Sequence, residues 1–202
     1  MAEITLPSFG VKSLEMFLDG ADSPLEMLNR SEVIVSGPVA LWNINIPLAL
    51  DAATAETKRA WRSVLVQLIK LSNNFKVAMP DWPGNGASYT GNNPLVKGTG
   101  QLGTSLNCDN VTVSTLVAKD GDYLEVNGEF KVLTADPTSD VSGNVTFNFE
   151  PALRVAPPDD DPIDIKTPKA TFRLLSPRGG WLVSKPDIYN ITLIGKEWFS
   201  AT

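Results

Sequence analysis

The sequence predicts a mainly β fold with a single flanking helix, and three observations support this. Short alternating runs of polar and apolar residues, such as 39–47, 142–153 and 187–199, lie between clusters of Gly, Pro, Asn and Asp. Only residues 54–72 repeat apolar side chains at helical spacing. The chain has 202 residues, 43% of them hydrophobic and 20% charged, which is enough to bury a core.

The order of these segments predicts two parts of the chain. Strands near both termini flank the helix, so we expect them to share one sheet. Residues 1–79 and 166–202 then form a β-sandwich domain, and residues 80–165 form an inserted module of loops and β-hairpins. The expected strands are 11–18, 39–47, 75–79, 111–117, 123–126, 129–133, 142–153, 162–166, 171–175, 181–185 and 187–199, with a turn-like segment at 21–30 and a long loop over 73–110.

The predicted helix has a recognisable beginning and one apolar side. Asp51 or Thr54 is placed to cap it, and Glu56 falls in the first turn, where a negative charge favours the helix dipole. A helix with one apolar stripe packs against a sheet through that stripe. The stripe consists of Trp61, Val64, Leu65, Leu68 and Leu71.

Residues 121–132, GDYLEVNGEFKV, predict a β-hairpin with Asn127–Gly128 at its tip. Asn and Gly both tolerate the positive φ of a type I′ turn. Asp122 is interpreted as a turn side chain that bonds nearby backbone N–H groups. Asp122 and Glu125 form a poor acid/base pair, because side chains three apart on a strand point to opposite faces.

Composition excludes several classes of function. The chain has no histidine, which removes Ser-His-Asp triads and the commonest metal ligand, and a single cysteine, Cys108, which forms no intrachain disulfide. The net charge of −6 argues against sequence-specific nucleic-acid binding. No apolar run of 18 residues and no signal peptide is visible, so we expect no membrane span and synthesis in a cytoplasm. We predict that the protein is not an enzyme.

The candidate ligand sites are weak. Asp159, Asp160, Asp161 and Asp164 lack the calcium-loop pattern and are interpreted as a solvated acidic loop. The glycine-rich residues 84–93 have no phosphate-binding lysine and no following helix. We therefore predict no catalytic residue, no cofactor and no metal.

Four residues are predicted to lie at interfaces: Trp82, Tyr89, Arg154 and Arg173. Trp82 lies on a proline-stiffened loop, which suits a contact residue. Arg154 and Arg173 are expected to pair with acidic residues on a neighbouring subunit or a neighbouring strand. The five tryptophans are a candidate carbohydrate-binding set: Trp42, Trp61, Trp82, Trp181 and Trp198. Three of them fall on elements with buried-face periodicity, so core packing is the default interpretation, and Trp82 is the exception.

The order of motifs over residues 38–200 resembles minor tail proteins of long-tailed bacteriophages and prophages, of the distal tail or baseplate-hub kind. The motifs are LWNINIPL, AWRSVLVQL, FKVAMPDWP, GTGQLGTSL, GDYLEVNGEFKV, SGNVTFNFEPALR and TPKATFRLL, followed by W-x-V and a last alternating strand.

The resemblance implies a tail-tube-like β-sandwich and a ring, commonly a homohexamer, at the tail tip of a virion. The ring would join the tail tube protein to the baseplate hub and tail fibre proteins, and DNA would pass through its lumen without specific binding. An acidic lumen would repel the DNA backbone. The alternative is a β-sandwich module that binds a cell-surface glycan or another ligand. A carboxylate-dependent glycan hydrolase is a third class, which the spacing of Asp122 and Glu125 disfavours.

Overall fold

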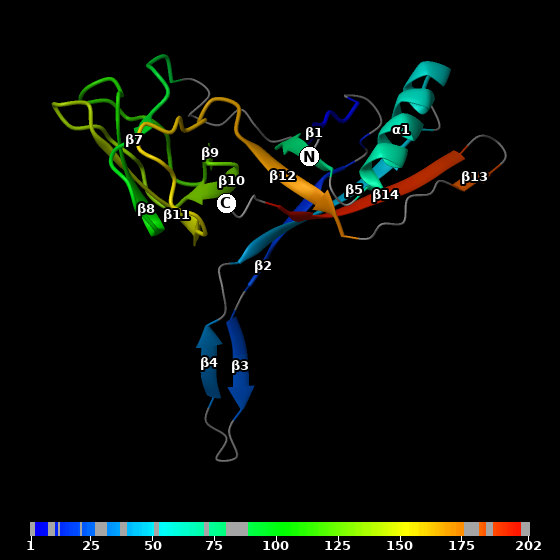
Figure 1. Ribbon diagram of the computed structural model, residues 1–202, viewed down its shortest axis with the longest axis horizontal. Coiled ribbons are helices and arrows are strands. Elements are labelled where there is room, and N and C mark those ends of the chain that lie inside the picture. Colours follow the sequence, from blue (N-terminus) through cyan, green and yellow to red (C-terminus); the bar gives the residue numbers. More distant parts are fainter. Residues whose placement is uncertain are drawn as a thin grey trace. The chain divides into compact units, whose positions relative to one another are not determined.

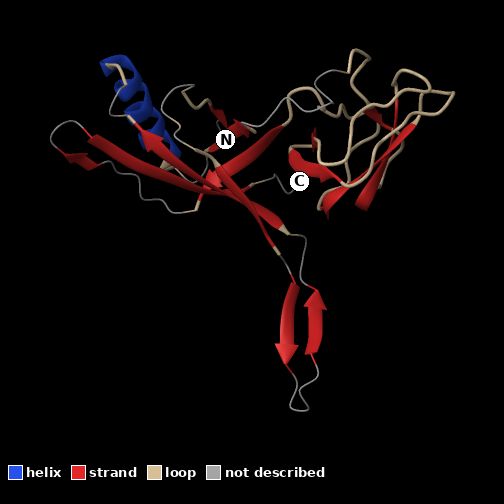
Figure 2. Cartoon of the chain, turned by 180° about the vertical axis from the view of Figure 1, so that it is seen from behind, coloured by secondary structure: helices blue, strands red, loops and turns tan. Residues whose placement is uncertain are grey.

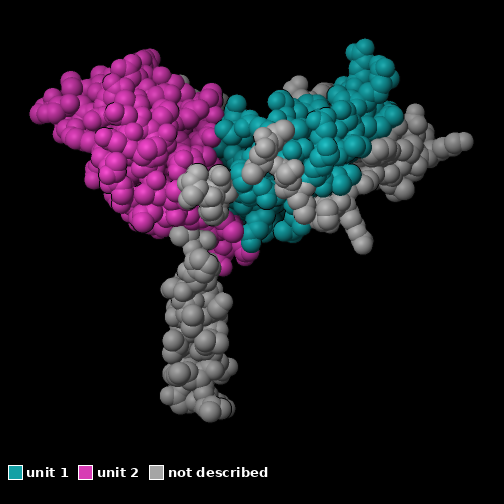
Figure 3. Space-filling model, viewed as in Figure 1, with its two compact units in different colours: residues 1–17, 42–80, 169–202 teal, residues 18–41, 81–168 magenta. Residues whose placement is uncertain are grey.

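The computed structural model describes residues 3–7, 11, 13–20, 22–26, 32–36, 40–50, 53–70, 73–79, 89–175, 182–184 and 188–198. Over these residues the chain is mainly β with one helix, α1 (Ala55–Leu68), which confirms the predicted fold class (Figure 1). The chain divides into two compact units (Figure 3). Unit 1 comprises residues 1–17, 42–80 and 169–202, and unit 2 comprises residues 18–41 and 81–168.

Unit 1 is built on a sheet of seven described strands that joins the first and last parts of the chain. The strand order is β1-β6-β12-β14-β5-β2, and β13 also pairs with β14. β12 is antiparallel to both β6 and β14, and β14 is antiparallel to β5. The strands are β1 (Glu3–Ile4), β2 (Glu15–Asp19), β5 (Leu41–Ala49), β6 (Asn74–Ala78), β12 (Lys169–Leu174), β13 (Leu182–Ser184) and β14 (Ile188–Glu197).

Cross-strand register separates an apolar face of this sheet from a polar one. Leu193 lies opposite Ile46, and Phe172 lies opposite Phe75, so their side chains share one face, and all four are buried. α1 lies on one side of the sheet (Figure 2). The buried residues of the helix, Trp61, Val64, Leu65 and Leu68, pack against the apolar face. We call the other side the helix-free face. Its side chains include Asn45, Lys76, Lys169, Thr171, Arg173, Ile194 and Lys196.

The ends of α1 follow from local hydrogen bonds. The Thr54 side chain accepts from the backbone N–H of Thr57 at 3.2 Å, which confirms one of the two predicted caps. Asp51, the other candidate, lies outside the described residues. The helix ends at Leu68, before the predicted residue 72, and the Asn73 amide donates to the Gln67 carbonyl at 2.9 Å. That bond adds a second donor to a carbonyl of the last turn, which also accepts from the Lys70 backbone N–H at 3.3 Å.

Unit 2 contains a five-stranded sheet with the order β7-β8-β11-β10-β9 in the described residues. Its core includes Leu106, Leu124, Phe147, Phe149 and Ile163, all fully buried. The strands are β7 (Leu95–Val96), β8 (Gly103–Asp109), β9 (Tyr123–Val126), β10 (Glu129–Leu133) and β11 (Val145–Leu153). A separate antiparallel pair consists of β3 (Asp22–Glu26) and β4 (Glu32–Ser36).

The predicted hairpin at residues 121–132 is confirmed. β9 and β10 pair with Glu129 opposite Val126, and the two tip residues have positive φ, 49° at Asn127 and 76° at Gly128. Asp122 is also as predicted, because its carboxylate accepts from the Lys119 backbone N–H at 3.0 Å. The stretch is therefore a structural hairpin.

The strand predicted at 111–117 is wrong. These residues form a turn and make only one isolated bridge, Leu116 with Thr138. Ser114 has a φ of 51°, outside the β region, and the Ser139 hydroxyl bonds the backbone of Thr112 and Thr115. Side-chain hydrogen bonds from a distant loop replace a strand ladder here, so alternation alone was misleading.

Four other segments differ from the prediction. Residues 73–110 are predicted as a long loop, but they contain β8. The pairing of β8 with β11 stabilises a strand there despite its polar composition. Residues 162–166 make isolated bridges instead of a strand. β3 occupies part of the turn-like segment 21–30, and β2 begins at Glu15 rather than at residue 11. For β8 and β3, pairing with another strand outweighs local composition.

Gly195→Ala should destabilise unit 1. A Cβ there would lie 3.0 Å from the Ile44 side chain and 3.1 Å from the Phe75 ring, both fully buried. Overpacking of this kind costs about 1–3 kcal/mol of the free energy of unfolding, which chemical denaturation measures. The control is Thr192→Ala, at an exposed position of β14. Equal stability of the two variants would contradict the predicted close packing.

Candidate functional site

A shallow depression opens beside the ends of β12 and β14, within unit 1. Its volume is about 300 Å³. The Arg173 guanidinium stacks over the Trp198 ring, 4.5 Å from its centroid. The Trp198 backbone N–H donates to the Thr171 carbonyl at 2.9 Å, which continues the strand register past β14. The depression is lined by Arg173, Leu174, Leu175, Lys196, Glu197 and Trp198.

Apolar side chains on the helix-free face lie next to cationic ones. Ile194 is 49% exposed and Leu175 is 61% exposed, although both are large aliphatic residues. The Leu175 backbone N–H donates to the Ile194 carbonyl at 3.0 Å, so the two residues are neighbours. Arg173 and Lys196 lie directly opposite each other in the β12–β14 register. This surface therefore combines aliphatic contact area with two cations.

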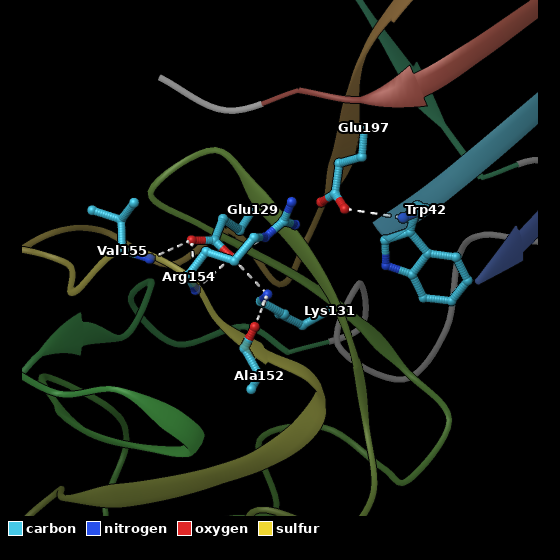
Figure 4. A network of polar contacts seen from close by, with 7 residues as sticks. All are labelled: Trp42, Glu129, Lys131, Ala152, Arg154, Val155 and Glu197. Atoms are coloured by element: carbon cyan, nitrogen blue, oxygen red, sulfur yellow. Dashed lines mark hydrogen bonds and ion pairs between the residues drawn. The ribbon is translucent and has the colours of Figure 1, made fainter. Parts of the chain in front are cut away.

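The Glu197 side chain lies on the opposite face of the sheet from the Lys196 side chain. It points to the apolar face and is 5% exposed, and its carboxylate accepts from the Trp42 backbone N–H at 3.2 Å (Figure 4). This bond links the start of β5 to the end of β14. It helps to hold the register that places Lys196 and Trp198 together on the helix-free face.

Charge is divided unequally between the two units. Unit 1 contains eleven Lys and Arg against six Asp and Glu, whereas unit 2 contains six against seventeen. The helix-free face follows this trend with Lys76, Lys169, Arg173 and Lys196. Two acidic residues also lie there: Glu3, 3.8 Å from Lys76, and Glu15, which accepts from Asn45.

Two neighbouring loops of unit 2 expose aliphatic side chains. We call residues 111–117 and 137–143 the loop pair. Val141 is 84% exposed, and Val113 and Leu116 are also exposed. The alternation of 111–117 predicts a strand, so the sequence gives no sign of this surface. Exposed apolar residues that are gathered on adjacent loops indicate a contact surface.

Hydrogen bonds hold the loop pair in one conformation. The Ser114 N–H donates to the Asp140 carbonyl, and the Ser139 N–H donates to the Thr115 carbonyl, each at 3.0 Å. The Asp140 carboxylate accepts from the backbone N–H groups of Ser142 and Asn144 and from the Asn144 amide. These bonds hold the pKa of Asp140 below its usual value, led by the Asn144 amide.

A buried cluster of charges joins β10 to the segment after β11. Glu129 and Lys131 are fully buried and 2.7 Å apart, and Lys131 also donates to the Ala152 carbonyl (Figure 4). The Glu129 carboxylate accepts further bonds from the Arg154 Nε and from the backbone N–H groups of Arg154 and Val155. Arg154 thus pairs with a neighbouring strand of its own chain, one of the two predicted alternatives.

The other predicted interface residues lie in different surroundings. Tyr89 is buried in the core of unit 2, and its hydroxyl accepts from the Thr112 backbone N–H at 2.8 Å. A Cβ at Gly91 would overlap that hydroxyl, so Tyr89 is closely packed. Trp82 lies outside the described residues. Arg173 belongs to the depression, so the structure does not bring these four residues to one described site.

The remaining tryptophans do not form one described surface. Trp61 belongs to the buried stripe of α1 and is fully buried, which confirms core packing for that residue. Trp42 and Trp198 are half-buried in unit 1. Trp181 lies outside the described residues.

The predicted acidic loop uses its carboxylates in local hydrogen bonds. Asp159 accepts from the Gly98 N–H at 2.6 Å, and Asp164 accepts from the backbone N–H groups of Lys166 and Thr167. Burial raises the pKa of Asp161. Over the part of the chain that the structure describes, no group of three Cys, Asp or Glu residues is placed to hold a metal ion.

Comparison with known proteins adds no relative. No protein-family model matches the chain, and no curated protein matches it. Among the described residues, no helix has the length and apolar character needed to cross a membrane.

Glu129→Ala should destabilise unit 2 strongly. The substitution leaves Lys131 buried without its carboxylate partner, and such a loss costs about 3–5 kcal/mol. Urea denaturation measures the change in the free energy of unfolding. The matched control is Glu150→Ala, which removes an exposed carboxylate from β11. A similar small change in both variants would contradict a structural role for the buried cluster.

The Cys108 thiol should be unreactive in the folded protein. It is fully buried, and burial raises its pKa well above the usual range, with the Asp109 carboxylate adding to the rise. The thiolate is the reactive form, so a thiol reagent at pH 8 should modify the chain only after unfolding. Rapid modification of the folded protein would show that unit 2 opens around β8.

Proposed function

We propose that this chain is a structural protein of a phage tail tip, forming a ring that joins the tail tube to the baseplate hub. The observation that carries the proposal is the edge strand β2, which ends the order of described strands in unit 1. β2 exposes Phe17 and Leu18, 49% and 39% respectively. An edge strand with exposed apolar side chains favours pairing with another chain.

A ring follows from an interface that uses two different surfaces of each copy. The sheet has unlike ends, β2 on one side and the two-residue strand β1 on the other. An unlike pair of surfaces makes a head-to-tail contact, which closes into a ring when the rotation between copies permits. The hexameric order and the tail tube and hub partners come from the sequence resemblance.

The distribution of charge agrees with a channel through which DNA slides. Seventeen of the 23 acidic residues belong to unit 2. A negatively charged wall repels the phosphate backbone and prevents DNA from binding. We therefore expect unit 2, rather than the basic helix-free face of unit 1, to line the path of the DNA.

The loop pair favours a second candidate function, a module that binds a cell-surface ligand. Its loops are held by internal hydrogen bonds and expose Val113, Leu116 and Val141, as binding loops on rigid scaffolds do. Neither 111–117 nor 137–143 contains an aromatic residue to stack on a sugar ring. A protein ligand therefore fits the loop pair better than a glycan does.

Electron microscopy of the purified protein tests the first candidate. We expect closed rings with a central channel wide enough for duplex DNA, and light scattering should give one oligomer mass. Phe17→Lys should convert the rings to monomers, because it replaces an exposed aromatic side chain at the centre of β2 with a third charge, between Glu15 and Asp19. Val66→Lys is the control for adding a lysine at an exposed apolar residue, since Val66 lies on α1 and not on β2.

Two outcomes would contradict the ring. One is a chain that forms no ring either alone or together with tail tube and hub proteins. The other is a monomer that binds a cell-surface protein through the loop pair, which would support the second candidate instead.

A further inference from the structure

We propose that the loop pair of one copy docks on the helix-free face of a second copy, at the depression beside Trp198. The inference deepens the proposed ring function and rests on it. It names a contact between copies that differs from the strand edge β2. Both surfaces are exposed in the described chain, and they belong to different units.

The two surfaces match in their apolar centres. The loop pair presents Val113, Leu116 and Val141, and the helix-free face presents Leu175 and Ile194. The depression beside them, about 300 Å³, is large enough to receive an aliphatic side chain such as that of Val141. Interfaces between proteins commonly have such an apolar centre within a polar rim.

The rims of the two surfaces carry opposite charges. Asp140 precedes Val141, and the exposed residues Asp120 and Asp136 flank the two segments, where the cations Lys97 and Lys119 also lie. Arg173 and Lys196 lie opposite each other, next to Ile194 on the helix-free face. Opposite charges around an apolar centre fix the register of docking and exclude wrong partners.

The charge of whole units favours the same pairing over longer distances. Unit 1 has five more basic than acidic residues, whereas unit 2 has eleven more acidic than basic ones. Approach of unit 2 to unit 1 of another copy is therefore attractive, and approach of like units is repulsive. This complementarity commits the proposal to a second copy of the chain as the occupant.

The loop pair is organised for binding before contact. Ser139 is buried, and its hydroxyl donates to the Thr112 carbonyl at 2.5 Å while it accepts from the Thr115 N–H at 2.9 Å. Loops already held in one conformation lose little entropy when they dock. Each copy carries both a loop pair and a helix-free face, so the contact repeats from copy to copy.

Two single substitutions test the contact. Val141→Lys places a cation opposite Arg173 and Lys196, and Lys196→Glu places an anion opposite the acidic rim. Each should weaken self-association by about tenfold, as measured by sedimentation velocity at low salt. Val66→Lys is the control for adding a lysine at an exposed valine elsewhere. Circular dichroism should show that all three variants remain folded.

A mixture of the two variants gives the decisive result. The ammonium group introduced by Val141→Lys on one copy would then meet the carboxylate introduced by Lys196→Glu on the next. The unaltered loop pair of the Lys196→Glu copy would meet the unaltered helix-free face of the Val141→Lys copy, as in the wild type. Association should return to near the wild-type level in the equimolar mixture and also in the double variant V141K/K196E. A merely unfolded or misfolded variant would not be rescued in this way.

Every other outcome overturns the inference. If both single variants self-associated as the wild type does and still formed rings by microscopy, this contact would be ruled out and the proposed ring function would remain supported. Failure of the mixture to recover would show that the two residues do not meet. A wild-type chain that stays monomeric at low salt would also refute the contact, even if rings form once tail partners are added.

Discussion

The register of β14 is the constraint on which the rest of unit 1 depends. β14 pairs with β5 along seven residues and with β12 at its end, so it connects strands from both ends of the chain. Gly195 lies where the Ile44 side chain and the Phe75 ring approach too closely for a Cβ. If the pairing of β14 shifted by one residue, a neighbouring side chain of β14 would enter that space. The side chains of β14 would then exchange the two faces of the sheet.

The same register creates both the covered and the uncovered face. Leu193 and Glu197 point toward the side of α1, whereas Ile194 and Lys196 point away from it. In unit 2, Glu129 has a comparable role, because its carboxylate joins β10 to the backbone after β11. A buried carboxylate is stable only when several donors surround it, so these contacts are mutually dependent.

Sequence reasoning succeeded where the determining contacts are local. The Asn127–Gly128 turn and the Thr54 cap involve residues within a few positions of each other. It failed at 111–117, where Ser139, more than 20 residues away, supplies the hydrogen bonds. The depression at Trp198 could not be predicted from the sequence either, because only the pairing of β12 with β14 brings Arg173, Lys196 and Trp198 together.

The net charge of −6 conceals a basic unit and an acidic one, and this changes how the charge bears on function. A uniformly acidic ring would pass DNA but would repel its own copies. A ring with Arg173 and Lys196 open to the channel would hold the phosphate backbone. In the proposed ring, docking of the loop pair, which carries Asp140, on the helix-free face would address both problems. It would pair the cations of one copy with carboxylates of the next and would leave the remaining acidic surface for the DNA path.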